Sequence, residues 1–217
     1  MLFLPTKITG TWLIESEKLE DERGFFARTF CSREFEERGL KTQFVQCSLS
    51  FNSRKATLRG MHFQLAPREE AKLVHCTRGA VYDVLIDVRR KSPSFGQWMA
   101  VELTAENRRM LYVPEGVAHG FQTLVDEAEV FYQISEFYDP AFSSGIRWND
   151  PAFAVAWPIE NPILSRRDRS YGLWPRNGNC ETVPLRPAPS APGCEAALSA
   201  LPASAEATSI GHFQFLG

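Results

Sequence analysis

Hydrophobic and polar residues alternate in short runs over most of the chain. In the clearest run, residues 81–88, every second residue from Tyr82 to Val88 is apolar, while Asp83 and Asp87 share the other face. A period of two residues is typical of β-strands, and Gly, Pro, Asn and Asp separate the runs between residues 12 and 157. The pattern predicts strands at 81–88 and at 11–14, 25–30, 44–50, 58–63, 73–77, 97–103, 109–113, 120–123 and 129–135.

So many short strands need two sheets, so we expect an all-β sandwich or barrel. Helix is scarce: Ser32 is expected to cap a short helix that carries Phe35 and ends at Gly39. The composition changes after Pro175, because residues 176–217 are rich in Ala and Pro and do not alternate. The sequence therefore predicts one domain over residues 1–175 and a tail over 176–217, either disordered or docked on the barrel.

Composition and charge limit the partners and the cellular compartment that we expect for the protein. The 217 residues carry a net charge of -2, which gives no long-range attraction to nucleic acid or to an acidic membrane. The N-terminal apolar stretch is too short for a signal peptide, and no run approaches the roughly 20 apolar residues of a membrane span. We expect a cytoplasmic protein with neither partner. The five cysteines are scattered without a C-x-x-C pair, which favours buried, reduced thiols over disulfides or a zinc site.

The residues with the clearest chemistry lie in two neighbouring segments, L-R-G-M-H-F-Q at 58–64 and K-L-V at 72–74. Because alternate strand residues share a face, we expect His62 and Lys72 on the same wall of one cavity. A base beside a cation suits proton abstraction next to a carbonyl: the imidazole takes the proton and the ammonium stabilises the enolate oxygen. Enolate chemistry is therefore the leading hypothesis.

Two further residues extend this hypothesis, although each has an ordinary structural interpretation when taken alone. Tyr132 lies in an apolar run and Asp168 in a polar segment. Together with His62 and Lys72 they would form a histidine base oriented by an aspartate, opposite a tyrosine acid. Arg23 and Arg59 stand beside glycines and could clamp an anion such as a diphosphate.

Several motifs, in this order along the chain, resemble those of the dTDP-4-dehydrorhamnose 3,5-epimerase family. The resemblance runs from about residue 5 to residue 175, and the tail has no counterpart. Beside the two segments above, the matching motifs are D-x-R-G-F-F at 21–26, S-P-S-F-G at 92–96, P-x-G-x-A-H-G-F at 114–121, Y-x5-Y at 132–138, G-I-x-W-N-D-P at 145–151 and S-x2-D at 165–168.

The resemblance implies a cupin-type sandwich, a double-stranded β-helix or jelly roll, in a homodimer that shares strands. It also implies a nucleotide-diphosphate-linked 4-keto-6-deoxyhexose as substrate, inverted at C3, C5 or both in deoxysugar (rhamnose-like) biosynthesis, with no cofactor and no metal. By motif position the implied catalytic residues are the base His62, its orienting carboxylate Asp168, the acid Tyr132 and the enolate stabiliser Lys72. The implied binding residues are Arg23 and Arg59 for the diphosphate, and Phe26, Gln46, His119, Tyr138 and Arg167 for the nucleotide and sugar.

Three binding positions depart from the family pattern: Arg28 and Ser143 stand in place of glutamates, and Ser48 in place of an asparagine. An arginine only donates hydrogen bonds, whereas a carboxylate accepts one from the ring N–H of thymine. Arg28 therefore favours a nucleotide other than dTDP, unless it turns outward to pair with Glu20 or Glu22.

Two alternatives remain open. P-x-G-x2-H at 114–119 fits a metal-binding cupin motif, with His62 as another ligand, but Gln64 is a poor ligand where such cupins have a histidine. The other alternative is a non-catalytic protein that binds sugar nucleotides with the same fold. The presence of both His62 and Tyr132 favours the enzyme.

Overall fold

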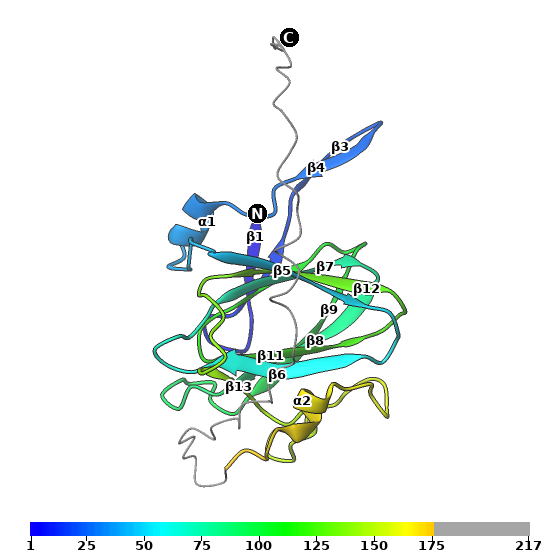
Figure 1. Cartoon of the computed structure of the whole chain (residues 1–217). Helices are drawn as coiled ribbons and strands as arrows, with labels where there is room; N and C mark the ends of the chain where they lie inside the picture. Colours follow the sequence, from blue (N-terminus) through cyan, green and yellow to red (C-terminus); the bar gives the residue numbers. More distant parts are fainter. Residues whose placement is uncertain (176–217) are drawn as a thin grey trace, which may run out of the picture. The chain divides into compact units, whose positions relative to one another are not determined.

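A computed structural model of the chain describes residues 1–175 and contains thirteen strands and two short helices in that range (Figure 1). The helices are α1 (Ser32–Glu36) and α2 (Arg166–Ser170). The strands are β1 (Leu2–Pro5), β2 (Trp12–Glu15), β3 (Lys18–Asp21), β4 (Gly24–Ala27), β5 (Gln46–Asn52), β6 (Leu58–Gln64), β7 (Lys72–Arg78), β8 (Ala80–Asp87), β9 (Trp98–Thr104), β10 (Met110–Val113), β11 (Val117–Thr123), β12 (Ala128–Ile134) and β13 (Ser143–Gly145).

Eleven of these strands form two sheets that face each other. The six-stranded sheet has the order β1-β2-β10-β7-β12-β5, and the five-stranded sheet has the order β13-β6-β11-β8-β9. Neighbouring strands are antiparallel throughout both sheets. Strands β3 and β4 form a separate hairpin, which projects away from the sandwich in Figure 1. The predicted all-β double sheet is confirmed.

Each predicted strand is present, with ends that differ from the predicted ones by at most three residues, and three further strands were not predicted. Strand β1 is a short edge strand paired with β2, β3 has four exposed residues, and β13 has the sequence Ser-Ser-Gly. None of the three carries an alternating apolar face long enough to be recognised. Neighbouring strands, rather than their own side chains, determine their position.

The predicted start of α1 is wrong by one residue, and the helix ends at Glu36, before the predicted Gly39, which closes the turn that follows. Cys31 occupies the N-cap and makes no side-chain hydrogen bond there, so Ser32 is already helical. At the other end, Gly39 has a φ of +66°. The N–H groups of Gly39 and Leu40 bond to the carbonyls of Glu36 and Phe35, which is the Schellman pattern that favours glycine.

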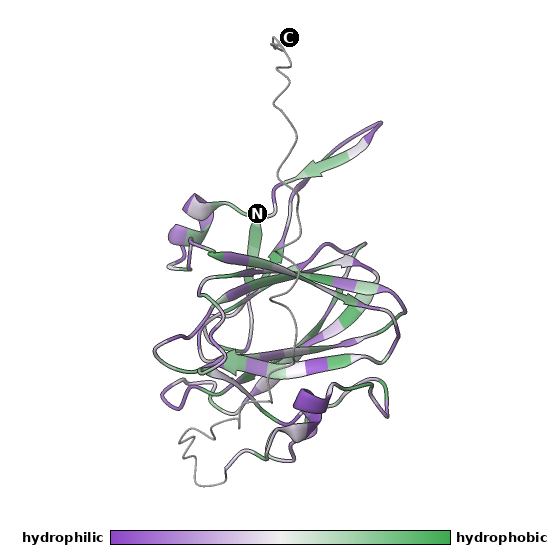
Figure 2. Cartoon of the chain, viewed as in Figure 1, coloured by the Kyte–Doolittle hydropathy of each residue, from purple (hydrophilic) through white to green (hydrophobic). Residues whose placement is uncertain are grey.

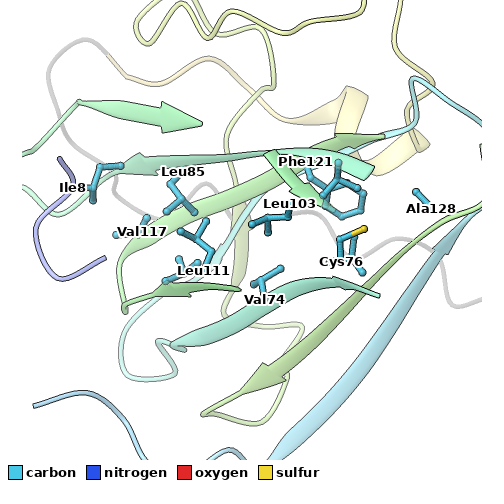
Figure 3. Packing of buried hydrophobic residues seen from close by; sticks show 12 residues of the cluster. Ile8, Val74, Cys76, Leu85, Leu103, Leu111, Val117, Phe121 and Ala128 are labelled. Carbon is cyan, nitrogen blue, oxygen red and sulfur yellow. The ribbon is translucent and has the colours of Figure 1, made fainter. Parts of the chain in front are cut away.

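The main core lies between the two sheets (Figure 3). Val74 and Cys76 from β7 meet Leu85 from β8 and Phe121 from β11, and each of them is at most 2% exposed. Asp83 and Asp87 do share one face of β8 as predicted, and both are completely buried. The opposite face of β8 is buried as well, because the segment after β13 packs against it.

Two smaller apolar clusters cover the outer faces of the sheets. Phe35 from α1 packs with Phe3 and Tyr112 on the six-stranded sheet. Phe153, from the segment after β13, packs with Met61 and Ile86 on the five-stranded sheet. In Figure 2 the two helices are largely hydrophilic and the strands carry most of the hydrophobic colour. No helix in residues 1–175 is long and apolar enough to span a membrane.

The cysteine prediction is only partly correct. Cys31, Cys47 and Cys76 are free thiols, and Cys76 is buried as expected. Cys47 is exposed, because it lies on the outward face of the edge strand β5, so the expectation of burial is wrong there. Cys180, Cys194 and the predicted tail as a whole lie outside the described residues.

Candidate active site

A cavity of about 300 Å³ opens between the two sheets. Strands β6 and β11 line it from one sheet, and β5, β7 and β12 line it from the other. The predicted site residues that line it are His62, Lys72, Tyr132, Ser48, Arg59, His119, Tyr138, Ser143 and Arg167. The fold thus brings together residues that are far apart in the sequence.

His62 is paired with Asp168 behind the cavity wall. The Nε2 atom of His62 lies 2.6 Å from Oδ1 of Asp168, and Asp168 is only 3% exposed. Ser165 caps α2 by accepting a hydrogen bond from the backbone N–H of Asp168 at 3.0 Å, which fixes the first turn. The pKa of His62 is lowered, chiefly by burial, although Asp168 acts in the opposite direction. The imidazole is therefore neutral at neutral pH and able to accept a proton.

Tyr171, directly after α2, supports the same pair. Its ring meets the ring of His62 edge-on, with 5.9 Å between the centroids. Gly145 lies opposite His62 in the β13–β6 pairing, and a Cβ at Gly145 would lie only 2.6 Å from Cε2 of Tyr171. The absence of a side chain at Gly145 therefore gives Tyr171 its place beside the histidine.

Lys72 is held by a carboxylate that the sequence did not suggest. Its Nζ atom lies 2.9 Å from Oε1 of Glu70 and 3.3 Å from the carbonyl of His62, and both ionic residues are 9% exposed. The prediction that His62 and Lys72 share one wall is wrong, because β6 and β7 belong to different sheets. The lysine reaches toward the histidine strand from the opposite sheet. Glu70 was missed because it precedes the strand in a polar segment, where a carboxylate is usually solvated.

Tyr132 also lies opposite His62, on β12 of the six-stranded sheet. Burial raises the pKa of Tyr132 far above its ordinary value, so its hydroxyl stays protonated and can donate. Its ring meets His119 edge-on, with centroids 5.9 Å apart. His119 in turn contacts the completely buried Asp83, with 2.9 Å between Nε2 and Oδ2. His62 and Tyr132 thus face the cavity from opposite sheets. Asp168 lies beside His62, and His119 lies beside Tyr132.

Two guanidinium groups border the cavity. Arg59 donates from Nε to Oδ1 of Asn52 at 2.7 Å. Arg167 donates to three hydroxyl groups, those of Tyr171 at 2.9 Å, Tyr138 at 3.3 Å and Ser143 at 2.6 Å. Both cations therefore remain available to an anion in the cavity.

Four predicted binding residues do not line the cavity in this chain. Gln46 lies next to it and accepts a hydrogen bond from the backbone N–H of Tyr138 at 2.7 Å. Arg23 and Phe26 lie on the β3–β4 hairpin, where Phe26 is 71% exposed. Arg28 follows the hairpin and pairs with Glu34 at 3.4 Å, rather than with the glutamates expected from the sequence.

The side chain of Gln64 makes hydrogen bonds to three backbone groups. Its amide nitrogen donates to the carbonyls of Arg68 at 2.8 Å and Phe137 at 3.2 Å, and its oxygen accepts from the N–H of Asp139 at 2.7 Å. Within the part of the chain that the structure describes, no three His, Cys, Asp or Glu side chains come together as a metal-binding group. Gln64 instead fixes the loops at the mouth of the cavity.

Known proteins with similar sequences share one reaction type. A model of the dTDP-4-dehydrorhamnose 3,5-epimerase family matches residues 5–175. The dTDP-4-dehydrorhamnose 3,5-epimerase of Shigella flexneri is 46% identical over 169 residues, which are 77% of this chain and 93% of that protein. The dTDP-4-dehydrorhamnose 3-epimerase of Streptomyces niveus is 38% identical over 204 residues, covering 89% of this chain and 98% of that one.

Solved structures agree in fold. The crystal structure of the 3,5-epimerase from Bacillus anthracis with TDP and PPi bound has a TM-score of 0.77 and 41% identity, covering 79% of this chain and 98% of that one. The enzyme from Legionella pneumophila in complex with dTDP-4-keto-L-rhamnose has a TM-score of 0.74 and 38% identity, with coverages of 79% and 92%. The cupin-type fold is thereby confirmed. Sequence and fold agree over the whole described sandwich, so this chain belongs to the dTDP-4-dehydrorhamnose 3,5-epimerase family of isomerases.

Proposed function

We propose that this protein epimerises a nucleotide-diphosphate-linked 4-keto-6-deoxyhexose of the dTDP-4-dehydro-6-deoxyglucose type. Membership of the epimerase family supports the reaction type. The observation that carries the proposal is the His62–Asp168 pair at 2.6 Å, which faces Tyr132 and Lys72 across one cavity. A neutral base and a protonated acid on opposite walls can act on opposite faces of a sugar ring.

The proposed reaction moves protons only. The C4 ketone acidifies the hydrogens on C3 and C5, and His62 removes one of them while Asp168 stabilises the imidazolium that forms. The ammonium of Lys72 stabilises the enolate oxygen. Tyr132 then delivers its proton to the other face of the carbon, which inverts it, and exchange with solvent restores both residues. Substrate and product are isomers, so the residues of this chain suffice without a redox cofactor.

The proposal is tested by incubating the protein with dTDP-4-keto-6-deoxyglucose in deuterated water. We expect deuterium at the inverted carbon, read by NMR and mass spectrometry. Label at C3 alone would indicate a 3-epimerase, as the Streptomyces niveus relative is named, and label at C3 and C5 a 3,5-epimerase. Binding of the nucleotide sugar without any exchange would instead favour the non-catalytic alternative, and loss of turnover on treatment with a chelator would favour the metal-dependent one.

We further propose that the active form is a homodimer. Strand β5 is an edge strand, and its outward residues Leu49 and Phe51 are 57% and 48% exposed. The projecting β3–β4 hairpin carries Leu19 and Phe26, which are 69% and 71% exposed. An open edge with apolar residues favours pairing with another chain. A second copy would also account for Arg23, Phe26 and Arg28, which would then bind substrate in the partner's cavity.

The oligomeric state tests this second proposal. Wild-type protein is expected to sediment as a dimer, whereas Leu49→Ser/Phe51→Ser is expected to shift toward monomer with reduced turnover. Val125→Ser is the matched control, since Val125 is also exposed, at 40%, but lies outside this face. A wild-type monomer with full activity would contradict the proposal.

The remaining assignments follow from this function. We propose a cytoplasmic enzyme of deoxysugar biosynthesis that needs neither nucleic acid nor membrane. We also propose that residues 1–175 are the catalytic domain, because the family match ends at residue 175. A variant that ends at residue 175 is expected to keep its dimer and its turnover. Loss of either would show that residues 176–217 contribute to the assembly or the site.

A further inference from the structure

Two cations lie close enough to His62 to influence its protonation, and they differ in how they are compensated. Lys72, from β7, forms an ion pair with Glu70 at 2.9 Å. Arg167, from α2, has no carboxylate partner among the described residues, because its three bonds go to the hydroxyls of Tyr171, Tyr138 and Ser143. Arg167 is therefore the cation whose charge is not neutralised by a neighbouring acid.

The other charged groups around His62 either favour or disfavour its protonated form. Asp168, from α2, favours the protonated imidazole, whereas burial and the charges of Lys72 and Arg167 disfavour it. His119 lies opposite His62 in the pairing of β11 with β6 and has its own carboxylate partner, Asp83 of β8. The charge of Lys72 is offset by its ion pair with Glu70, because opposite charges partly cancel at a distance, whereas the charge of Arg167 has no such offset.

Ser143 is the residue that binds Arg167 without cancelling its charge. Its hydroxyl accepts from Nη2 at 2.6 Å, and it lies on β13, two residues before Gly145, which pairs with His62. A carboxylate at this position would form an ion pair with the guanidinium next to the base. A hydroxyl only fixes its direction.

We propose that Arg167 keeps His62 in its unprotonated, proton-accepting form, and that Ser143 preserves this effect by binding the guanidinium without neutralising it. The inference rests on the proposed function, in which His62 is the base, and deepens it. Its consequence is a base that works at a lower pH than it would beside a neutralised arginine.

The first test measures the histidine itself and needs no turnover. Protein with 15N-labelled histidines is titrated by NMR without substrate, and His62→Gln identifies the signal among the four histidines of the chain. The signal of His62 is expected to titrate at higher pH in Ser143→Glu and in Arg167→Gln than in wild type. Ser143→Gln and Arg167→Lys, which keep the uncompensated charge, are expected to titrate as wild type does.

A double variant separates the two residues. In Arg167→Gln the new carboxylate lacks the guanidinium that would hold it in place and keep it ionised, so Ser143→Glu should shift the titration much less there than in wild type. An equal shift in both backgrounds would mean that the carboxylate acts on His62 without Arg167. That result, or an unchanged titration in Arg167→Gln, would overturn the proposal.

The second test is the pH profile of kcat/KM, with each variant compared with its own plateau at high pH. At pH 5.5 Ser143→Glu is expected to lose about three- to tenfold more of its plateau value than wild type does. The pH profile of Ser143→Gln, scaled to its own plateau, should have the same shape as the scaled profile of wild type. An altered NMR titration in a protein that turns over no substrate would count against the proposed function alone, whereas turnover with an unaltered titration would count against the role of Arg167 alone.

Discussion

The Nε2 atom of His62 lies 2.6 Å from Oδ1 of Asp168, although 106 positions separate the two residues in the sequence. The contact joins strand β6 to helix α2, the last element of the described chain. Strands β7 to β13 lie between them in the sequence. The carboxylate reaches the histidine from a short helix that lies beside β6 (Figure 1).

Removing either partner of this pair should impair proton abstraction to a different degree. His62→Ala is expected to slow deuterium exchange at the sugar by on the order of 10³-fold or more, because the base is lost. Asp168→Asn keeps the shape but not the charge that stabilises the imidazolium, so a smaller loss is expected. Exchange is followed by NMR in deuterated water. Wild-type exchange in His62→Ala would show that the base is another residue.

Tyr132→Phe should separate exchange from inversion. The ring and its contact with His119 remain, but the proton donor on the opposite wall is lost. We expect the variant to retain part of the exchange, while the new epimer forms on the order of a hundredfold more slowly. Chiral analysis of the product beside the deuterium measurement distinguishes the two. If exchange and inversion are lost to the same degree, the assignment of His62 as base and Tyr132 as a separate acid is wrong.

Glu70→Gln should destabilise the protein, because it leaves the ammonium of Lys72 buried without its partner at 2.9 Å. Breaking a buried ion pair on one side costs about 3–5 kcal/mol of unfolding free energy. The double variant Glu70→Gln/Lys72→Met removes the isolated charge and is expected to recover part of the loss. Urea denaturation gives both values. Equal stability of Glu70→Gln and wild type would show that the pair is unimportant for the fold.

Arg28→Glu should change the choice of nucleotide if a second copy brings residue 28 to the base. The wild-type arginine only donates hydrogen bonds, so it favours cytosine or guanine over thymine. A lost hydrogen bond to a buried group corresponds to about ten- to hundredfold in affinity. Dissociation constants of dTDP, CDP and GDP are measured for both proteins. Tightest binding of dTDP by wild type, with no change in Arg28→Glu, would leave Arg28 as the partner of Glu34 only.

Stability should fall as the pH falls below the ordinary pKa of histidine, near 6.5, in part because of His75. Burial, and then the charge of Arg108, lower the pKa of His75, and its buried Nδ1 has no partner among the described residues. Between the folded and the unfolded pKa the unfolded chain binds more protons, so acidification favours unfolding. His75→Phe is expected to give a shallower loss between pH 7 and pH 5 by urea denaturation. An identical pH dependence in both proteins would contradict this.

The sandwich was predictable because its strands carry their own signal. Residues 81–88 alternate clearly, and the alternation correctly places Asp83 and Asp87 on one face of β8. Strand β3 could not be found this way, since all four of its residues are exposed and only its pairing with β4 defines it.

The site was predictable in its reactive residues and not in its geometry. The motif around His62 indicated a base and a nearby cation, but sequence spacing cannot show that the chain crosses to the other sheet between His62 and Lys72. Glu70 looked like a solvated carboxylate because burial is a property of the folded chain. Arg23 and Phe26 remain predictions, since their role depends on a second copy.

The His62–Asp168 pair depends on Gly145, a residue that has no reactive group of its own. Its missing side chain makes room for Tyr171, which ends α2 and so positions the helix that carries Asp168. A single added methyl group would push that ring, and the helix with it, away from the histidine. In a genetic screen for loss of function, Gly145→Ala should therefore be recovered together with changes at His62 itself.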